Sequence, residues 1–137
     1  LLGQRDRITV FGTDYDTPDG TCIRDYIHVE DLIDAHVATL GALREGECRA
    51  YNLGIGRGYS VREIIEATER VTGKSCNIVE GDRRAGDPPV LYTDPSLIRS
   101  ELGWSPSHSS LDDIISSAWS WFSSHPNGYV TIHGSLK

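Results

Sequence analysis

The stretch Phe11-Gly-Thr-Asp-Tyr-Asp-Thr-Pro-Asp-Gly-Thr-Cys-Ile-Arg-Asp-Tyr-Ile-His-Val-Glu-Asp-Leu32 decides how this sequence folds. It begins at the end of a short alternating apolar run, residues 7–11, which predicts a strand. Residues 12–20 are rich in Asp, Gly and Pro and predict a turn. Residues 21–28 alternate again and predict a second strand. Residues 31–44 carry apolar side chains at helical spacing before a glycine, so a helix is expected to follow.

The remainder of the chain mixes strand and helix signals. It predicts a strand over 50–53 and then a helix that runs from the capping box Ser60-Val-Arg-Glu63 to Gly73. A strand over 77–80 and a charged loop over 81–89 are expected next. Two helices complete the prediction: a short one that Asp94-Pro95 caps and starts and that ends near Gly103, and a last one that is capped by Ser110 and stopped by Pro126. A doubly wound dinucleotide fold needs a longer run of strand–helix units. The pattern therefore indicates a class between α/β and α+β.

Composition sets the outer bounds. The 137 residues carry a formal net charge of −7, which argues against a sequence-independent grip on nucleic acid. The absence of a long apolar run argues against a membrane span and a signal peptide. The three cysteines are widely spaced and odd in number, which favours a reducing, cytoplasmic setting. A chain with no methionine is expected to be cut from a longer protein.

A glycine cluster, Gly54-Ile-Gly56-Arg-Gly58, lies between a predicted strand and a predicted helix. The dinucleotide fingerprint G-x-G-x-x-G would require glycine where Tyr59 stands. A turn leading into a capped helix is the favoured interpretation, and an anion site at the helix start is the alternative.

Charged side chains provide two further candidates. Arg83 and Arg84 are adjacent in an acidic chain, and they are either solvated and paired with acids or bind an anion such as a diphosphate. Arg24 and Tyr26 share a strand face and either point into water or form one wall of a polar site. The five histidines show no metal-ligand spacing, so no metal site is expected.

Six elements in order resemble the UDP-glucose (UDP-galactose) 4-epimerase family. They are the opening stretch of residues 11–32, Tyr51-Asn-Leu-Gly54, Gly58-Tyr-Ser-Val61, Arg83-Arg84-x-Gly-Asp87, Leu102-Gly-Trp104 and His125-Pro-x-Gly-Tyr129. The resemblance covers residues 1–129, and the tail 130–137 matches nothing familiar. These epimerases are extended short-chain dehydrogenases/reductases of the NAD-dependent epimerase/dehydratase kind.

The resemblance implies a fold and partners. Family members bind NAD in an N-terminal Rossmann domain and a nucleotide sugar in a smaller C-terminal domain, to which residues 1–129 correspond. The helix over 31–44 and the strand over 50–53 are expected to pack on the Rossmann sheet. A UDP-sugar substrate and a homodimer are expected for the full-length protein, which would serve galactose metabolism.

The family inverts C4 of the sugar through a 4-keto intermediate, with a Tyr-x-x-x-Lys pair as base. The only lysines are Lys74 and Lys137, and Arg70 and His133 stand four residues before them. The pair is absent, so this chain alone is expected to be inactive and to contribute no catalytic or cofactor-binding residue.

The resemblance assigns substrate contacts instead. Arg24 and Arg84 match the arginines that hold the diphosphate, while Tyr26, Asp87 and Val61 match residues on the ribose and uracil side. Leu91 matches a gate beside the sugar, although Tyr92 is one register away, and its size suggests tolerance of N-acetylated sugars.

Other functions remain open at this point. One is a related nucleotide-sugar enzyme, such as a pentose epimerase, a dehydratase or a decarboxylase. Another is a domain that binds a nucleotide sugar without catalysis.

Overall fold

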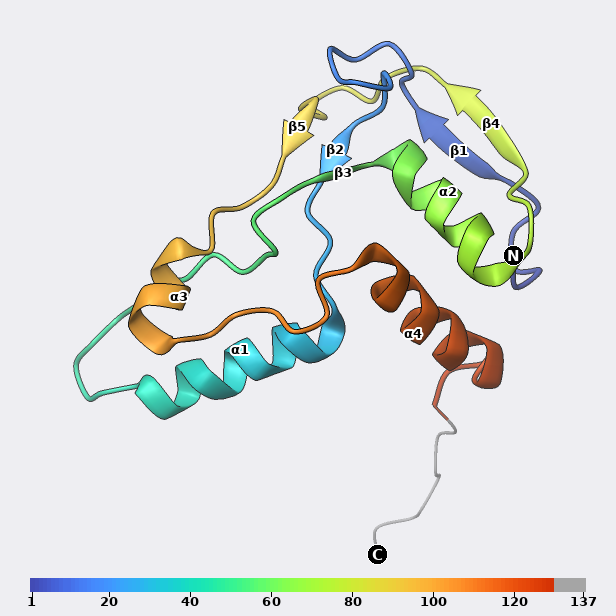
Figure 1. Cartoon of the computed structure of the whole chain (residues 1–137). Helices are drawn as coiled ribbons and strands as arrows, with labels where there is room; N and C mark the ends of the chain where they lie inside the picture. Colours follow the sequence, from blue (N-terminus) through green and yellow to red (C-terminus); the bar gives the residue numbers. More distant parts are fainter. Residues whose placement is uncertain (130–137) are drawn as a thin grey trace, which may run out of the picture.

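The computed structural model describes residues 1–129, and the predicted tail over 130–137 lies outside that range (Figure 1). In chain order the elements are β1 (Ile8–Phe11), β2 (Ile23–Arg24), α1 (Val29–Ala42), β3 (Tyr59–Ser60), α2 (Val61–Thr72), β4 (Ile78–Gly81), β5 (Val90–Leu91), α3 (Ser96–Leu102) and α4 (Leu111–Ser124). Strands and helices alternate without a regular repeat, which confirms the mixed α/β character.

Two small sheets form the upper part of the molecule in Figure 1. In the first, β1 and β4 run parallel with Ile8 opposite Ile78 and Phe11 opposite Gly81. In the second, β2 lies in the middle, antiparallel to β3 and parallel to β5. Parallel neighbours need a crossover, and the chain between β1 and β4 supplies one that contains α1 and α2.

Local capping signals set the helix ends. The Ser60 hydroxyl accepts a hydrogen bond from the Glu63 N–H at 3.0 Å, and the Glu63 carboxylate accepts one from the Ser60 N–H at 2.7 Å. The helix α2 ends at Gly73, whose φ of 66° is left-handed and suits glycine. Ser110 caps α4 in the same way, by accepting from the Asp113 N–H at 3.1 Å. The capping box and both caps were predicted and are confirmed.

The core consists of two clusters. One joins α1 and α3 through Ala35, Ile98 and Trp104, of which the first two are fully buried. The other joins β3, α2 and α4 through Tyr59, Ala67 and Leu111. Figure 1 shows the corresponding division, with α1 and α3 at one end of the molecule and α2 and α4 packed together near β1 and β4.

Some strand predictions were wrong. Residues 50–53 form no strand, because no segment among residues 1–129 runs alongside them; Tyr51 and Leu53 pack on the Ala35 cluster from a loop instead. The strand expected over 21–28 shrinks to two residues, since its neighbours β3 and β5 are only two residues long. Neither of those short neighbours was predicted.

The start of α3 also differs by one position. Pro95 precedes the helix as its N-cap, although the Asp94 carboxylate still accepts a hydrogen bond from the Ser96 N–H at 2.9 Å. None of the helices within residues 1–129 is both long and apolar enough to cross a membrane.

Candidate substrate-binding site

Two loops leave the same end of the parallel pair β1 and β4. Phe11 and Gly81 end the two strands opposite each other, and the Gly12 N–H donates to the Gly81 carbonyl at 2.8 Å. The loop over 12–20 and the loop over 82–89 therefore begin side by side, at the top of Figure 1. The carboxyl ends of parallel strands are where ligands bind in open α/β sheets, so this edge is a natural place for a site.

Arg84 and Asp87 lie together on the second of these loops. Their side chains form an ion pair at 3.0 Å, with 62% of the Arg84 side chain and 27% of the Asp87 side chain exposed. The Arg84 guanidinium also lies over the Phe11 ring, 4.8 Å from its centroid. An exposed guanidinium with several free N–H groups can still bind a diphosphate through its planar fork.

Arg24 and Leu91 lie on the same face of the three-stranded sheet. Arg24 is opposite Leu91 on the parallel strand β5 and opposite Tyr59 on β3. Side chains of directly opposite residues share a face, so Leu91 points to the side of Arg24. Tyr92 takes the other face, because its ring is 3.2 Å from the position of a Cβ on Gly58. Of the two gate candidates, Leu91 therefore has the orientation that matches Arg24.

Tyr26 and Val61 border this face. Tyr26 packs against the cluster of Tyr59, Ala67 and Leu111. Burial raises the pKa of the Tyr26 phenol, and the nearby Arg24 charge offsets part of that rise, so the hydroxyl stays protonated at neutral pH. Val61 opens α2, where its N–H donates to the Cys22 carbonyl at 3.0 Å.

The structure thus arranges the six predicted site residues in two groups. Arg84 and Asp87 are in contact on one loop, and Arg24, Tyr26, Val61 and Leu91 lie on or beside the three-stranded sheet. Two cavities of the chain are lined by other residues. An apolar groove of about 940 Å³ runs along β1, α2 and α4, and a smaller cavity of about 390 Å³ lies between α2 and the start of α4.

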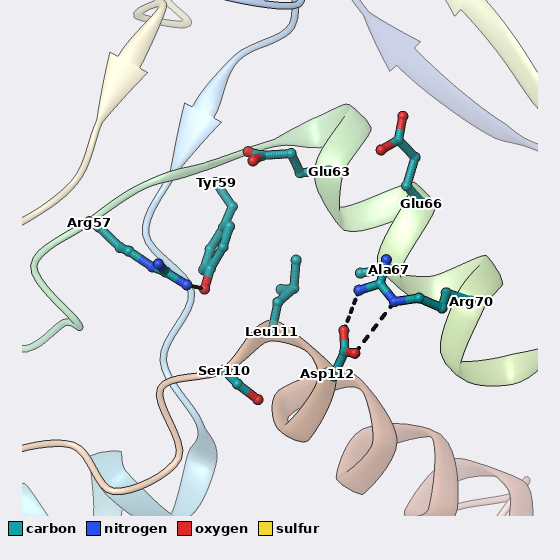
Figure 2. A pocket seen from close by; sticks show the side chains of 9 residues that line it. All are labelled: Arg57, Tyr59, Glu63, Glu66, Ala67, Arg70, Ser110, Leu111 and Asp112. Atoms are coloured by element: carbon teal, nitrogen blue, oxygen red, sulfur yellow. Dashed lines mark hydrogen bonds and ion pairs between the residues drawn. The ribbon is translucent and has the colours of Figure 1, made fainter.

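The smaller cavity is a structural contact between two helices (Figure 2). Arg70 forms an ion pair with Asp112, and Arg57 lies over the Tyr59 ring at 4.5 Å and hydrogen-bonds its hydroxyl. Both arginines that line the cavity are therefore already bound to protein groups, and Glu63 belongs to the capping box. We assign no ligand to this cavity.

The glycine cluster is explained by close packing. A Cβ on Gly54 would lie 2.1 Å from the Asp25 carboxylate and 2.2 Å from the Thr93 hydroxyl. A Cβ on Gly58 would lie 2.2 Å from the Ile23 side chain. The glycines admit neighbouring side chains, which favours the turn interpretation. These residues do not fit a dinucleotide cradle.

Asp25 is a residue that the sequence pattern did not single out. Its carboxylate accepts hydrogen bonds from the Ile55 N–H at 3.3 Å and from the Thr93 N–H at 3.3 Å and hydroxyl at 3.1 Å. It therefore ties the Arg24 strand to the segment that follows Leu91. The partners are 30 and 68 residues away, and no local spacing reveals such a link.

His28, Glu30 and His108 also come together, with ligand atoms within 4.8 Å of one another. Both nitrogens of the His28 ring are engaged: Nδ1 accepts from the Glu30 N–H at 3.1 Å, and Nε2 bonds the Ser117 hydroxyl at 2.7 Å. A metal ion would have to displace one of these contacts, and we propose no metal site there.

Known proteins of similar sequence and structure identify the family of this chain. A family model described as GDP-mannose 4,6 dehydratase matches residues 13–117. A UDP-glucose 4-epimerase from Azospirillum brasilense is 55% identical over 122 residues, which are 88% of this chain and 35% of the relative. The chain thus spans little more than a third of that relative's length.

Two solved structures extend the likeness to three dimensions. The UDP-glucose 4-epimerase of Bifidobacterium longum, in complex with NAD+ and UDP, superposes with a TM-score of 0.87 at 42% identity, over 93% of this chain and 38% of that one. The UDP-Glc/GlcNAc 4-epimerase of Campylobacter jejuni gives 0.80 at 48% identity, over 89% of this chain and 37% of that one.

Together, the mixed fold and these likenesses define the class of protein, which is a part of the Rossmann-type short-chain dehydrogenases/reductases. The chain belongs to the extended short-chain dehydrogenase/reductase family, in its NAD-dependent epimerase/dehydratase branch.

Proposed function

We propose that residues 1–129 form the C-terminal, UDP-sugar-binding part of an NAD-dependent UDP-glucose/UDP-galactose 4-epimerase. The observation that carries the proposal is the placement of two arginines from separate segments. Arg84 presents an exposed guanidinium on the loop after β4, and Arg24 lies on β2 with Leu91 beside it. Two planar forks on separate segments can hold a diphosphate from two sides.

The remaining site residues would then orient the nucleoside and the sugar. Asp87, next to Arg84, can accept hydrogen bonds from ribose or uracil, and Val61 offers an apolar wall. Binding energy gathered on the UDP moiety can be used to orient the sugar for reaction elsewhere in the enzyme. Such a role in substrate binding agrees with the absence of the catalytic Tyr-x-x-x-Lys pair from this chain.

In the intact enzyme NAD would be held by the portion that this chain does not include. The relatives support this proposal, because the Bifidobacterium longum structure contains NAD+ and UDP and the chain spans only part of it. The chain alone is expected to show no epimerase activity. We further propose a cytoplasmic homodimer that acts in galactose metabolism, and the three free cysteines agree with a reducing setting.

The test is calorimetric titration of the full-length protein with UDP and UDP-glucose. Replacing Arg84 by Ala should weaken binding of both by about 1.5–3 kcal/mol, the range of a hydrogen bond to a charged group. Lys74→Ala, which removes a charge far from the predicted site, is the matched control and should bind as the wild type. An unchanged affinity for UDP in the Arg84 variant would remove the basis of the proposal.

The size of Leu91 bears on the sugar. It points to the face of Arg24, is 58% exposed and is smaller than a tyrosine would be at this gate, so we propose that the full-length enzyme also accepts UDP-N-acetylglucosamine. Turnover of UDP-glucose, UDP-N-acetylglucosamine and UDP-arabinose should be compared for the wild type and Leu91→Tyr. The substitution should reduce turnover of the N-acetylated sugar selectively, and absence of that turnover in the wild type would refute the idea.

A further inference from the structure

Arg83 and Arg84 are equivalent in the sequence, yet the structure gives them opposite surroundings. Arg84 faces its own loop partner Asp87 and solvent. Arg83 reaches across to the loop over 12–20, where its Nε donates to the Asp14 carboxylate at 2.7 Å and its Nη2 donates to the Asp14 carbonyl. Its guanidinium also lies over the Tyr15 ring, 4.3 Å from the centroid.

These contacts are the only hydrogen bonds that connect residues 82–88 to another segment of the described chain. Within that loop the other bonds are internal, between Arg84 and Asp87. The strand register fixes the loop at Gly81, and the Ile23 N–H bonds the Pro89 carbonyl at 2.8 Å. Between those two points Arg83 alone ties the loop down by hydrogen bonds.

The loop over 12–20, to which Arg83 binds, is held in place by its own contacts. Tyr15 is 94% buried, and the Tyr15 N–H donates to the Gly20 carbonyl at 2.9 Å. Gly12 leaves room for the Arg83 side chain, because a Cβ there would lie 2.8 Å from the Arg83 Cγ. Its φ of 81° is a left-handed conformation that side chains other than glycine rarely adopt.

From this loop the contacts continue to the three-stranded sheet. The Asp19 carboxylate accepts hydrogen bonds from the Thr21 N–H at 2.8 Å and the Thr21 hydroxyl at 2.7 Å, and it also bonds the Ser60 hydroxyl. Ser60 is paired with Ile23, the residue before Arg24, and precedes Val61. An uninterrupted series of contacts therefore joins the Arg84–Asp87 loop, through Arg83, to the elements that hold Arg24 and Val61.

We infer that Arg83 is a positioning residue, which acts through Asp14 and Tyr15 to hold the loop of Arg84 and Asp87 in place. The inference rests on the proposed function. The competing role is direct contact of Arg83 with the diphosphate, which its sequence position also allows. The ion pair is exposed, with 47% and 74% of the two side chains accessible, so its contribution to overall stability is small and its effect should appear in binding.

The experiment uses the full-length protein and measures affinity for UDP and for uridine by competition. Arg83→Ala should weaken both ligands roughly tenfold, because the loop carries a diphosphate ligand and a nucleoside-side residue together. Asp14→Asn should weaken both severalfold, and the double variant should be no worse than Arg83→Ala alone. Arg83→Lys, which keeps one contact to Asp14, should be intermediate. Asp16→Asn, an exposed acid of the same loop, is the control and should bind as the wild type.

Two results would overturn the inference. One is a loss confined to UDP with uridine unaffected and with Asp14→Asn neutral or tighter, which would make Arg83 a direct phosphate ligand. The other is wild-type affinity in both Arg83→Ala and Asp14→Asn while Arg84→Ala is impaired. If Arg84→Ala also binds UDP normally, the proposed function fails as well, so the two failures are distinguishable. Should Arg83→Ala fold poorly, the Asp14→Asn and Arg83→Lys variants carry the test.

Discussion

The helices α1 and α2 resemble each other in length and periodicity, but they bury opposite kinds of surface. In α2 the buried residues are apolar: Ile65 is 6% and Ala67 is 1% exposed, and most of the charged residues of this helix are exposed. In α1 the inner face is made by Asp31 and Ala35, at 1% and 0% exposure. Most of the large apolar residues of α1 are exposed instead.

That exposed row, the α1 stripe, consists of Val29, Ile33, Val37, Leu40 and Leu43, each between 56% and 67% exposed. Their spacing of three and four residues places them on one side of the helix. An exposed apolar row of this size is typical of a contact surface. The two helices therefore differ in what covers them. The buried side of α2 packs on β3 and α4 within this chain, whereas the α1 stripe stays exposed among residues 1–129, and we expect the Rossmann sheet of the intact protein to cover it.

The largest effect should come from α2. Replacing Ile65, which is 6% exposed, by Ala removes buried methyl groups and leaves a cavity, which should lower the unfolding free energy by about 2–5 kcal/mol. Urea unfolding of the full-length protein measures this, with amide hydrogen exchange in α2 as a local readout. A loss below about 1 kcal/mol would contradict the interior role of this face.

The inner face of α1 depends on a carboxylate. Asp31 accepts hydrogen bonds from the Ser107 N–H at 2.8 Å, the Ser107 hydroxyl at 2.8 Å and the His108 N–H at 3.0 Å. Asp31→Asn should cost about 1–3 kcal/mol, because an amide group cannot accept at both ends and leaves a buried N–H without a partner. The matched control is Asp34→Asn on the exposed side of the same helix, which should change stability little.

The same carboxylate predicts a pH dependence. Burial would raise the pKa of Asp31, but the hydrogen bonds from Ser107 and His108 outweigh it and hold the pKa below its usual value. A group with a depressed folded-state pKa contributes stability above its unfolded pKa of about 3.9, and this contribution is lost as the pH falls through the folded-state value. Urea midpoints from pH 7 down to pH 3 should therefore fall more steeply for the wild type than for Asp31→Asn. Parallel curves would show that Asp31 does not supply this component.

A smaller effect should follow from the cap of α2. Ser60→Ala removes the side-chain acceptor for the Glu63 N–H and the contact to Asp19, and it should cost about 1 kcal/mol, within the usual range for an N-cap. Ser60→Thr keeps a hydroxyl and should recover most of that loss. Thermal unfolding of both variants is the measurement, and equal losses would point to crowding at this position rather than to capping.

These contrasts also separate what the sequence could predict from what it could not. Caps act between residues three positions apart, so Ser60, Gly73 and Ser110 were readable from local spacing. The two-residue strands β3 and β5 were not, because their pairing with β2 joins segments far apart in the chain. The segment over 50–53 has a composition typical of a strand, but it forms none because no other segment of residues 1–129 pairs with it.

The candidate site shows the same limit. Sequence resemblance selects Arg24, Arg84 and Leu91. The strand register then shows that Leu91 lies on the same face of the sheet as Arg24, whereas Tyr92 lies on the opposite face. No pattern in the sequence distinguishes Arg83 from Arg84. The difference arises from a tertiary contact. Arg83, and not Arg84, bonds Asp14 in the loop over 12–20, which lies 69 residues away in the sequence.

The smallest effect is the one that tests the comparison most directly. Ile33→Ala in the isolated chain repeats the substitution of Ile65, but at a side chain that is 56% exposed, so the unfolding free energy should change by less than about 0.5 kcal/mol. In the full-length protein the same variant should cost about 2 kcal/mol or more, because there we expect the α1 stripe to be covered, so that the substitution creates a cavity. Urea unfolding of both forms gives the difference, and hydrogen exchange in α1 localises it. An equally small change in both forms would mean that α1 faces water in the intact protein too, and the contrast with α2 would then reflect an unusual surface helix rather than a domain contact.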